Sequence, residues 1–165
     1  MTIKVLKPEK CSSDQLNAFF GLVIEGNQVS RNGLMKRIKA ADFLSFCELD
    51  NKVIGVASIK NPDNNYKKST FKSANVEELA DKFDYEIGYA VTKETHRRRG
   101  ISEQLIKSLI NNSTTKSFYA TTKNDGMRSL LEKVGFSKLG DDFLNDNNET
   151  LTLYQHGITF RHTGG

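Results

Sequence analysis

Apolar residues recur at helical spacing in four stretches of the chain. Ser12 and Gln15 form a capping-box pattern, which predicts the start of a helix. The residues that follow are apolar at positions i, i+3, i+4 and i+7: Leu16, Phe19, Phe20 and Val23. The same period predicts a helix after Ser30 and further helices over 99–112 and 124–134, the last of which ends at Gly135.

Short, largely apolar or alternating runs predict strands along the chain. They cover residues 2–7, 43–49, 52–59, 85–92, 117–121, 136–139 and 150–155. Asp50-Asn51 is typical turn chemistry and predicts a hairpin. The long polar segment from Lys60 to Asp84 predicts only a short helix over 76–82. The order of elements indicates a mixed α/β sheet flanked by helices.

Composition narrows the class of protein. The 165 residues include 24 Lys and Arg against 20 Asp and Glu, a net charge of +4 that suits an anionic ligand or an ordinary surface. We expect a single domain over 1–160 and a disordered tail over 161–165. Two cysteines make no disulfide framework, and scattered histidines predict no metal site. Without a signal-like or membrane-spanning run, we expect a soluble cytoplasmic protein.

The stretch from Glu86 to Ser102 holds the most informative chemistry. A predicted strand runs into the basic loop Arg97-Arg98-Arg99-Gly100, which opens a predicted helix. Helix N-termini present unpaired N–H groups and partial positive charge, and glycine permits close approach of a ligand. The sequence lacks the Gly-Lys-Ser/Thr ending of a P-loop and the dinucleotide fingerprint. A solvated basic turn or a nucleic-acid contact is the competing interpretation.

Two motifs in this order resemble the GNAT superfamily of acyl-CoA-dependent N-acyltransferases. The first is Arg97-x-x-Gly100-x-Ser102, with serine where the family has glycine or alanine. The second is Asn124-x-x-Met127-x-x-Leu130-Leu131-x-x-x-Gly135-Phe136. The resemblance covers nearly the whole chain. It implies a mostly antiparallel central sheet flanked by helices, in which a splayed pair of strands holds acyl-CoA.

The resemblance also implies roles for individual residues toward acetyl-CoA, the expected co-substrate. The loop backbone would hold the pyrophosphate, and the strand backbone would pair with the pantetheine arm. Asn124 would touch the arm as well, although a helix N-cap explains it equally. The implied coenzyme-binding residues are Ala90, Val91, Thr92, Arg97, Arg98, Arg99, Gly100, Ile101, Ser102 and Asn124.

Acyl transfer to an amine needs a base for the ammonium proton. Glu86, eleven residues before Arg97, is the candidate, since several GNAT enzymes carry a glutamate base at this spacing. Alternation places Glu86, Gly88 and Ala90 on one strand face, unless the bulge common in the family interrupts it. An ion pair or a solvated strand end is the other explanation of Glu86.

The general acid toward the leaving thiolate is not identified by the sequence. Leu131 stands where many family members have a tyrosine, and leucine donates no proton. The tyrosines that remain as donors are Tyr66, Tyr89, Tyr119 and Tyr154. Neither cysteine lies in a nucleophile motif, which favours direct attack by the amine in a ternary complex.

The function expected from these patterns is transfer of an acetyl group from acetyl-CoA to a primary amine of a small molecule or protein. A non-catalytic acyl-CoA-binding module is the first alternative, and a tRNA-directed acetyltransferase is the second. The modest net charge makes nucleic acid an improbable partner. No membrane partner is expected, and a homodimer is left open by the resemblance.

Overall fold

The computed structural model describes residues 1–26 and 29–160, which form two compact units. The first unit comprises Met1–Pro62 and Tyr85–Thr114, and the second comprises Asp63–Asp84 and the chain from Thr115 onward. The single domain expected over 1–160 therefore stays a prediction. The tail expected over 161–165 lies outside the described residues.

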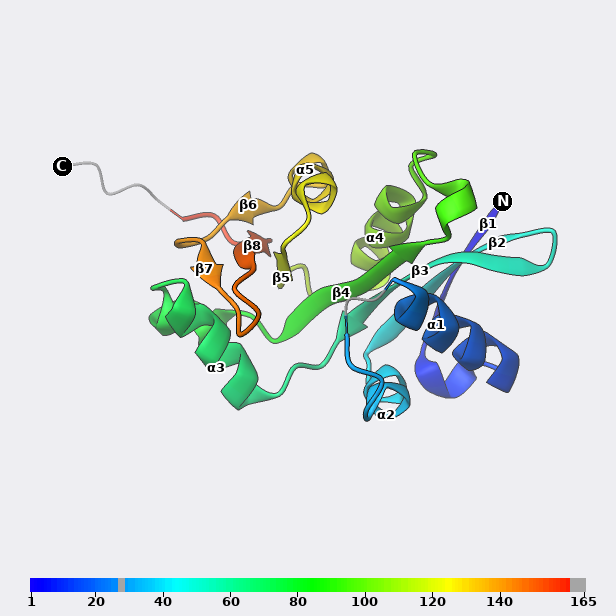
Figure 1. Cartoon of the computed structure of the whole chain (residues 1–165), viewed down its shortest axis with the longest axis horizontal. Helices are drawn as coiled ribbons and strands as arrows, with labels where there is room; N and C mark the ends of the chain where they lie inside the picture. The colour runs from blue at the N-terminus through cyan, green and yellow to red at the C-terminus, as the bar shows by residue number, and fades with distance from the viewer. Residues whose placement is uncertain (27–28, 161–165) are drawn as a thin grey trace. The chain divides into compact units, whose positions relative to one another are not determined.

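The first unit is built on four antiparallel strands in the order β1-β2-β3-β4 (Figure 1). The strands are β1 (Thr2–Leu6), β2 (Phe43–Leu49), β3 (Lys52–Lys60) and β4 (Tyr85–Thr92). The α-helices are α1 (Ser13–Glu25), α2 (Leu34–Lys39) and α4 (Ile101–Asn112). Short 3-10 turns are η1 (Pro8–Lys10) and η3 (Glu94–His96).

Local chemistry explains where these elements begin and turn. Ser12 and Gln15 form the predicted capping box at the start of α1, with each side chain accepting from the other residue's backbone N–H. Asp50 and Asn51 both adopt positive φ, of 52° and 62°, which is the backbone that a two-residue hairpin between β2 and β3 requires. Both sequence predictions are confirmed.

Helices cover both faces of the first unit's sheet. On one face, Leu44, Phe46 and Val56 pack with Phe19 of α1 and Leu34 of α2 in a fully buried core. On the other face, Gly55 of β3 lies so close to Ile101 of α4 that a Cβ there would come within 2.8 Å of its side chain. The strand β4 thus carries one face toward α1 and α2 and the other toward α4.

The second unit is a smaller antiparallel sheet with two helices. Its strands are β5 (Phe118–Thr122), β6 (Ser137–Lys138), β7 (Phe143–Leu144) and β8 (Thr150–His156), with β8 paired to the other three. Its helical segments are α3 (Asn64–Ser73), η2 (Glu77–Lys82) and α5 (Asp125–Lys133). Phe71, Phe83, Tyr119 and Leu153 are the large residues of its core.

The helix α3 was not predicted. It lies within the polar segment where only the helix over 76–82 was expected, and it buries just Lys67, Thr70 and Phe71. Its start is fixed by Asp63, whose side chain accepts the backbone N–H of Tyr66 at 3.0 Å. Two of those three buried residues are polar, so the segment has no apolar stripe to reveal a helix.

The predicted fold class is confirmed as a mixed α/β fold with a mostly antiparallel sheet flanked by helices. Every strand pairing described within the two units is antiparallel. The splayed strand pair that would hold acyl-CoA stays a prediction.

Candidate functional site

The loop that joins β4 to α4 has an unusual backbone. Arg98 and Gly100 both adopt positive φ, of 66° and 73°, and Gly100 is the N-cap of α4. A left-handed residue costs about 1 kcal/mol when it is not glycine, so Arg98 holds a strained conformation. The predicted helix begins at Ile101 rather than at Arg99, because Gly100 takes a left-handed conformation outside the helix.

This backbone leaves a row of N–H donors without an acceptor among the described residues. Within the part of the chain that the structure describes, no group accepts a hydrogen bond from the backbone N–H of any residue from Arg98 to Ser102. A Cβ added at Gly100 would meet no atom within 4 Å. Five consecutive donors beside open space, at the positive end of a helix, suit a phosphate group well.

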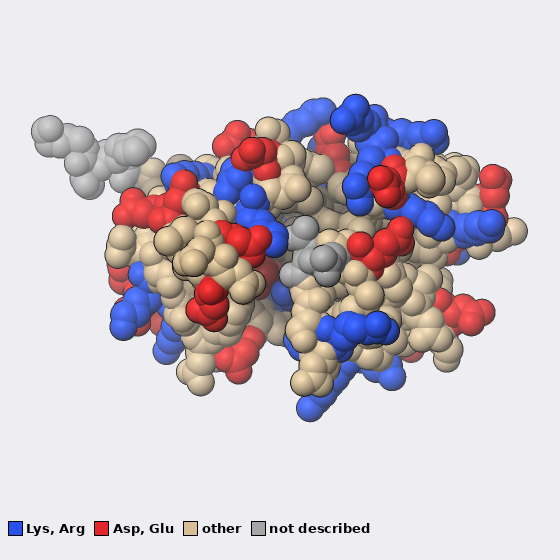
Figure 2. All heavy atoms as spheres, in the orientation of Figure 1, with Lys and Arg blue, Asp and Glu red and all other residues tan. Residues whose placement is uncertain are grey.

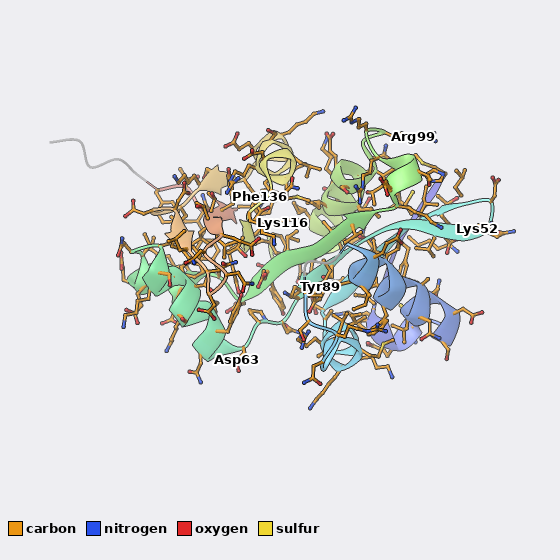
Figure 3. The ribbon with its side chains drawn as sticks, in the orientation of Figure 1. Lys52, Asp63, Tyr89, Arg99, Lys116 and Phe136 are labelled. Carbon is orange, nitrogen blue, oxygen red and sulfur yellow. The ribbon has the colours of Figure 1, made fainter. Side chains whose placement is uncertain are left out.

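Basic side chains surround these donors. Lys93, Arg97, Arg98 and Arg99 are all exposed, and Figure 2 shows Lys and Arg side chains gathered over this loop. Arg99 lies at the tip of the loop and points away from the sheet (Figure 3). No described ion pair includes any of the three arginines. Their charge is therefore available to an anion.

Ser102 and Arg97 tie the loop to the end of β4. The hydroxyl of Ser102 lies 2.8 Å from that of Thr92, and Nε of Arg97 donates to the Thr92 carbonyl at 3.3 Å. Serine at the last motif position is therefore bonded within the protein, which explains how the site accommodates it.

The strand β4 contains a bulge beside the candidate site. Ser58 pairs with Gly88 and Val56 pairs with Val91, so Tyr89 and Ala90 together oppose Ala57 alone. Tyr89 has a φ of 50°. The prediction that Glu86, Gly88 and Ala90 share one strand face therefore fails after Gly88, because the bulge that the family often has here interrupts the alternation.

The bulge sets the direction of the residues that follow it. Val91 packs in the core beneath α1, and a Cβ at Gly26 would come within 2.9 Å of its side chain. Thr92 faces α4 through its contact with Ser102. Ala90, which comes between Tyr89 and Val91, is half-buried.

Glu86 lies on the face of β4 that is covered by α1 and α2. It pairs across the strands with Lys60, with 3.5 Å between Oε1 and Nζ. The exposed fractions of the two side chains are 9% and 24%. The ion pair that the sequence offered as an alternative is thus present, and it holds the carboxylate beside Gly88.

Arg37 and Lys60 are further residues of this region that the sequence did not indicate. The Lys60 ammonium lies 4.3 Å from the centre of the Tyr89 ring. Nε of Arg37 donates to the Tyr89 hydroxyl at 3.3 Å. Arg37 precedes Tyr89 by 52 residues, so no local pattern signals the contact.

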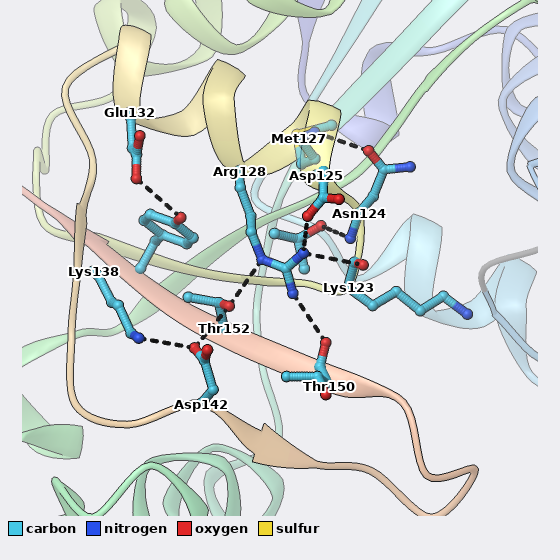
Figure 4. Close-up of polar contacts among 12 residues, drawn as sticks. Lys123, Asn124, Asp125, Met127, Arg128, Glu132, Lys138, Asp142, Thr150 and Thr152 are labelled. Atoms are coloured by element: carbon cyan, nitrogen blue, oxygen red, sulfur yellow. Dashed lines mark hydrogen bonds and ion pairs between the residues drawn. The ribbon is translucent and has the colours of Figure 1, made fainter.

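Asn124 belongs to the second unit and is the N-cap of α5. Its side chain accepts the backbone N–H of Met127 at 3.0 Å, which confirms the capping role (Figure 4). Arg128 secures the same turn, with bonds to Asp125, to Thr152 and to the Thr150 carbonyl. Thr152 in turn donates to Asp142. The Lys138 ammonium, and after it this bond from Thr152, lowers the pKa of the Asp142 carboxyl. The contact of Asn124 with coenzyme A stays a prediction.

The four tyrosines proposed as acids differ in their surroundings. Tyr66 is 60% exposed on α3, and Tyr119 is fully buried against Phe71. Tyr154 donates to Glu132, and burial together with that carboxylate raises its pKa. Tyr89 alone belongs to the unit that holds Glu86. Leu131 is buried on α5.

Neither thiol is suited to nucleophilic attack. Burial raises the pKa of Cys47, which is fully buried in β2, and burial with the nearby Glu9 raises that of Cys11. A raised pKa reduces the thiolate fraction at neutral pH.

Residues 1–26 and 29–160 contain neither a membrane-spanning helix nor a metal-ligand cluster. No helix there has the length and apolarity to cross a membrane. No three His, Cys, Asp or Glu side chains there gather as metal ligands.

Solved structures of acyltransferases resemble the whole chain. An acyl-CoA N-acyltransferase from Pseudomonas aeruginosa is 12% identical, with a TM-score of 0.68 over 95% of this chain and 100% of its own. A ribosomal-protein-alanine N-acetyltransferase from Brucella melitensis is 15% identical, with a TM-score of 0.64 over 96% and 100%. A GNAT family acetyltransferase from Elizabethkingia anophelis with acetyl-CoA bound is 15% identical, with a TM-score of 0.62 over 95% and 97%. At these identities the likeness shows a shared fold.

The fold is that of acyl-CoA N-acyltransferase structures. The sequence pattern of the acetyltransferase (GNAT) family matches residues 16–136, so the chain belongs to that family. Transfer of an acyl group from acyl-CoA is the reaction of the family. No protein of curated function matches the sequence significantly.

Proposed function

We propose that the protein transfers an acetyl group from acetyl-CoA to a primary amine. The observation that carries this proposal is the row of unpaired N–H donors from Arg98 to Ser102, beside three arginines that take part in no ion pair between described residues. These groups fit the pyrophosphate of a coenzyme A ester. A similar fold carries acetyl-CoA in the Elizabethkingia anophelis structure, and the Brucella melitensis structure is of an enzyme named for an alanine acceptor.

The bound thioester supplies the activated acetyl group, and the chain's own residues position it and manage the protons. The backbone from Ala90 to Thr92, beyond the bulge, orients the arm of the coenzyme. Glu86 accepts the proton of the incoming ammonium, directly or through a water molecule. The amine nitrogen then forms its bond to the acetyl carbon as the carbon–sulfur bond breaks. The thiolate leaves and takes up the second proton, which the nitrogen loses as it becomes the amide.

Direct attack in a ternary complex is the route we propose. The two cysteines have raised pKa values and Cys47 is fully buried, so neither favours a covalent acyl-enzyme. Nothing in the proposed route requires an enzyme-bound acetyl group.

A non-catalytic acyl-CoA-binding module is the second candidate, and two observations favour it. Leu131 is a buried apolar residue where the family's tyrosine acid is expected. Glu86 is already paired with Lys60. Tight coenzyme binding without thioester consumption in the presence of any amine would identify such a module.

Glu86→Gln tests the proposed base. We expect kcat to fall by about 100-fold, since general base catalysis contributes roughly that much, while acetyl-CoA binding in calorimetry is retained. Glu48→Gln is the matched control, because Glu48 also forms a strand ion pair, with Lys4 at 3.0 Å, on β2. An unchanged kcat for Glu86→Gln would overturn the assignment.

A further inference from the structure

Four side chains form a continuous row on the α1 and α2 face of β4. Glu86 contacts Lys60 at 3.5 Å, and the Lys60 ammonium lies 4.3 Å from the centre of the Tyr89 ring. The Tyr89 hydroxyl accepts the bond from Arg37 at 3.3 Å. We call these residues the Glu86–Arg37 row. It runs from the proposed base at one end to a guanidinium at the other.

The row carries more positive than negative charge. Lys60 and Arg37 are cations, and Glu86 is the single anion among the four. None of the ion pairs between described residues includes Arg37. Its bonds go to the Tyr89 hydroxyl and to the carbonyls of Asn32 and Ser30, which are neutral. Three of its five N–H groups are used, and a guanidinium binds carboxylates by a two-pronged contact.

Arg37 is the exposed member of the row, and the other three side chains are more buried. The Glu86 side chain and Tyr89 are each 9% exposed, Lys60 is 24% exposed in its side chain, and Arg37 is exposed. An amine that reaches Glu86 therefore has the rest of its molecule beside the two cations. A polycationic amine meets repulsion there, whereas an amine with a negative group has its charge matched.

From this arrangement we infer that the acceptor carries a carboxylate in addition to its amine, as an amino acid does. The amine would lie at Glu86 and the carboxylate at Arg37. This inference names the acceptor class for the proposed function and rests on it.

The test compares acceptors that differ only in the negative charge. L-α-Amino acids and ω-amino acids are assayed against their matching amides, with thiol release from acetyl-CoA as the readout. We expect kcat/KM to favour the acids by at least about tenfold. In Arg37→Gln, the ratio of kcat/KM for an acid to kcat/KM for its amide should fall to within about threefold of one, mainly because KM for the acid rises. Arg37→Lys should give an intermediate ratio.

Arg31→Gln is the matched control. Arg31 is a neighbouring exposed arginine, stacked over Phe20 at 5.9 Å, and its loss should leave the ratio unchanged. Thermal unfolding checks that the variants fold. The comparison of acids with amides is made on the wild type, so it tests the inference even if Arg37→Gln does not fold.

Calorimetric titration of the amino acids into the coenzyme A complex separates the remaining outcomes. Equal turnover of acids and amides overturns the inference and leaves the proposed function standing. Binding of the acids without turnover supports the acceptor class and overturns acetyl transfer. Neither binding nor turnover with any amine overturns both.

Discussion

Ser102 stands where the family has glycine or alanine, and its contacts explain how serine is accommodated there. Its hydroxyl is bonded to Thr92 across the junction of β4 and α4, while its backbone N–H remains unpaired. The side chain thus joins the two elements, and the backbone N–H is the group that we expect to face the coenzyme.

Ser102→Ala removes the hydroxyl and keeps the backbone N–H, so it tests what the side chain contributes to stability. We expect the free energy of unfolding to fall by about 1 kcal/mol, the usual loss for one hydrogen bond, in urea denaturation. Ser108→Ala, on the same helix, is the control, since no described hydrogen bond involves its hydroxyl. If the free energy of unfolding falls no more than in the control, the contact with Thr92 contributes nothing to stability.

Single residues also mark the limit of sequence prediction. The sequence indicates Glu86 as the candidate base because the family resemblance gives its spacing from the motif along the chain. Its partner Lys60, 26 residues earlier, was not, because strand register is set by the folded sheet. The Tyr89 contact with Arg37 depends on the bulge and on the placement of α2, which no periodic pattern encodes.

At the scale of elements, helices with an apolar face were predicted well and the polar helix α3 was missed. The helices α1, α4 and α5 each show an apolar stripe and a capping or stop residue. The short strand β7 was also missed, since two residues carry no alternation.

The start of α5 is fixed by tertiary contacts as well as by its cap. Arg128→Met should lower the free energy of unfolding by about 2 kcal/mol, because it removes a 23% exposed guanidinium that bridges α5 and β8. Urea denaturation measures the change. Lys72→Met is the control, as an exposed cation on α3 of the same unit, and an equal effect of both variants would contradict this role.

At the scale of the whole molecule, the residues of the central claim all belong to the first unit. The loop from Arg97 to Ser102, the bulged strand β4 and Glu86 lie there. The sequence alone predicted the loop because its motif is contiguous. Asn124 belongs to the second unit, and the sequence predicts its contact with the coenzyme only through the family resemblance.

The central claim is that the backbone around Gly100 holds the coenzyme pyrophosphate. Calorimetric titration with acetyl-CoA tests it directly, using Gly100→Asp and Gly100→Asn as an isosteric pair. Both residues tolerate the φ of 73°, and they differ in charge. We expect the wild type to bind and the aspartate variant to lose at least about 100-fold in affinity through repulsion of the phosphates. The asparagine variant should lose clearly less. Equal affinities for wild type and Gly100→Asp, or no binding by the wild type, would contradict the account.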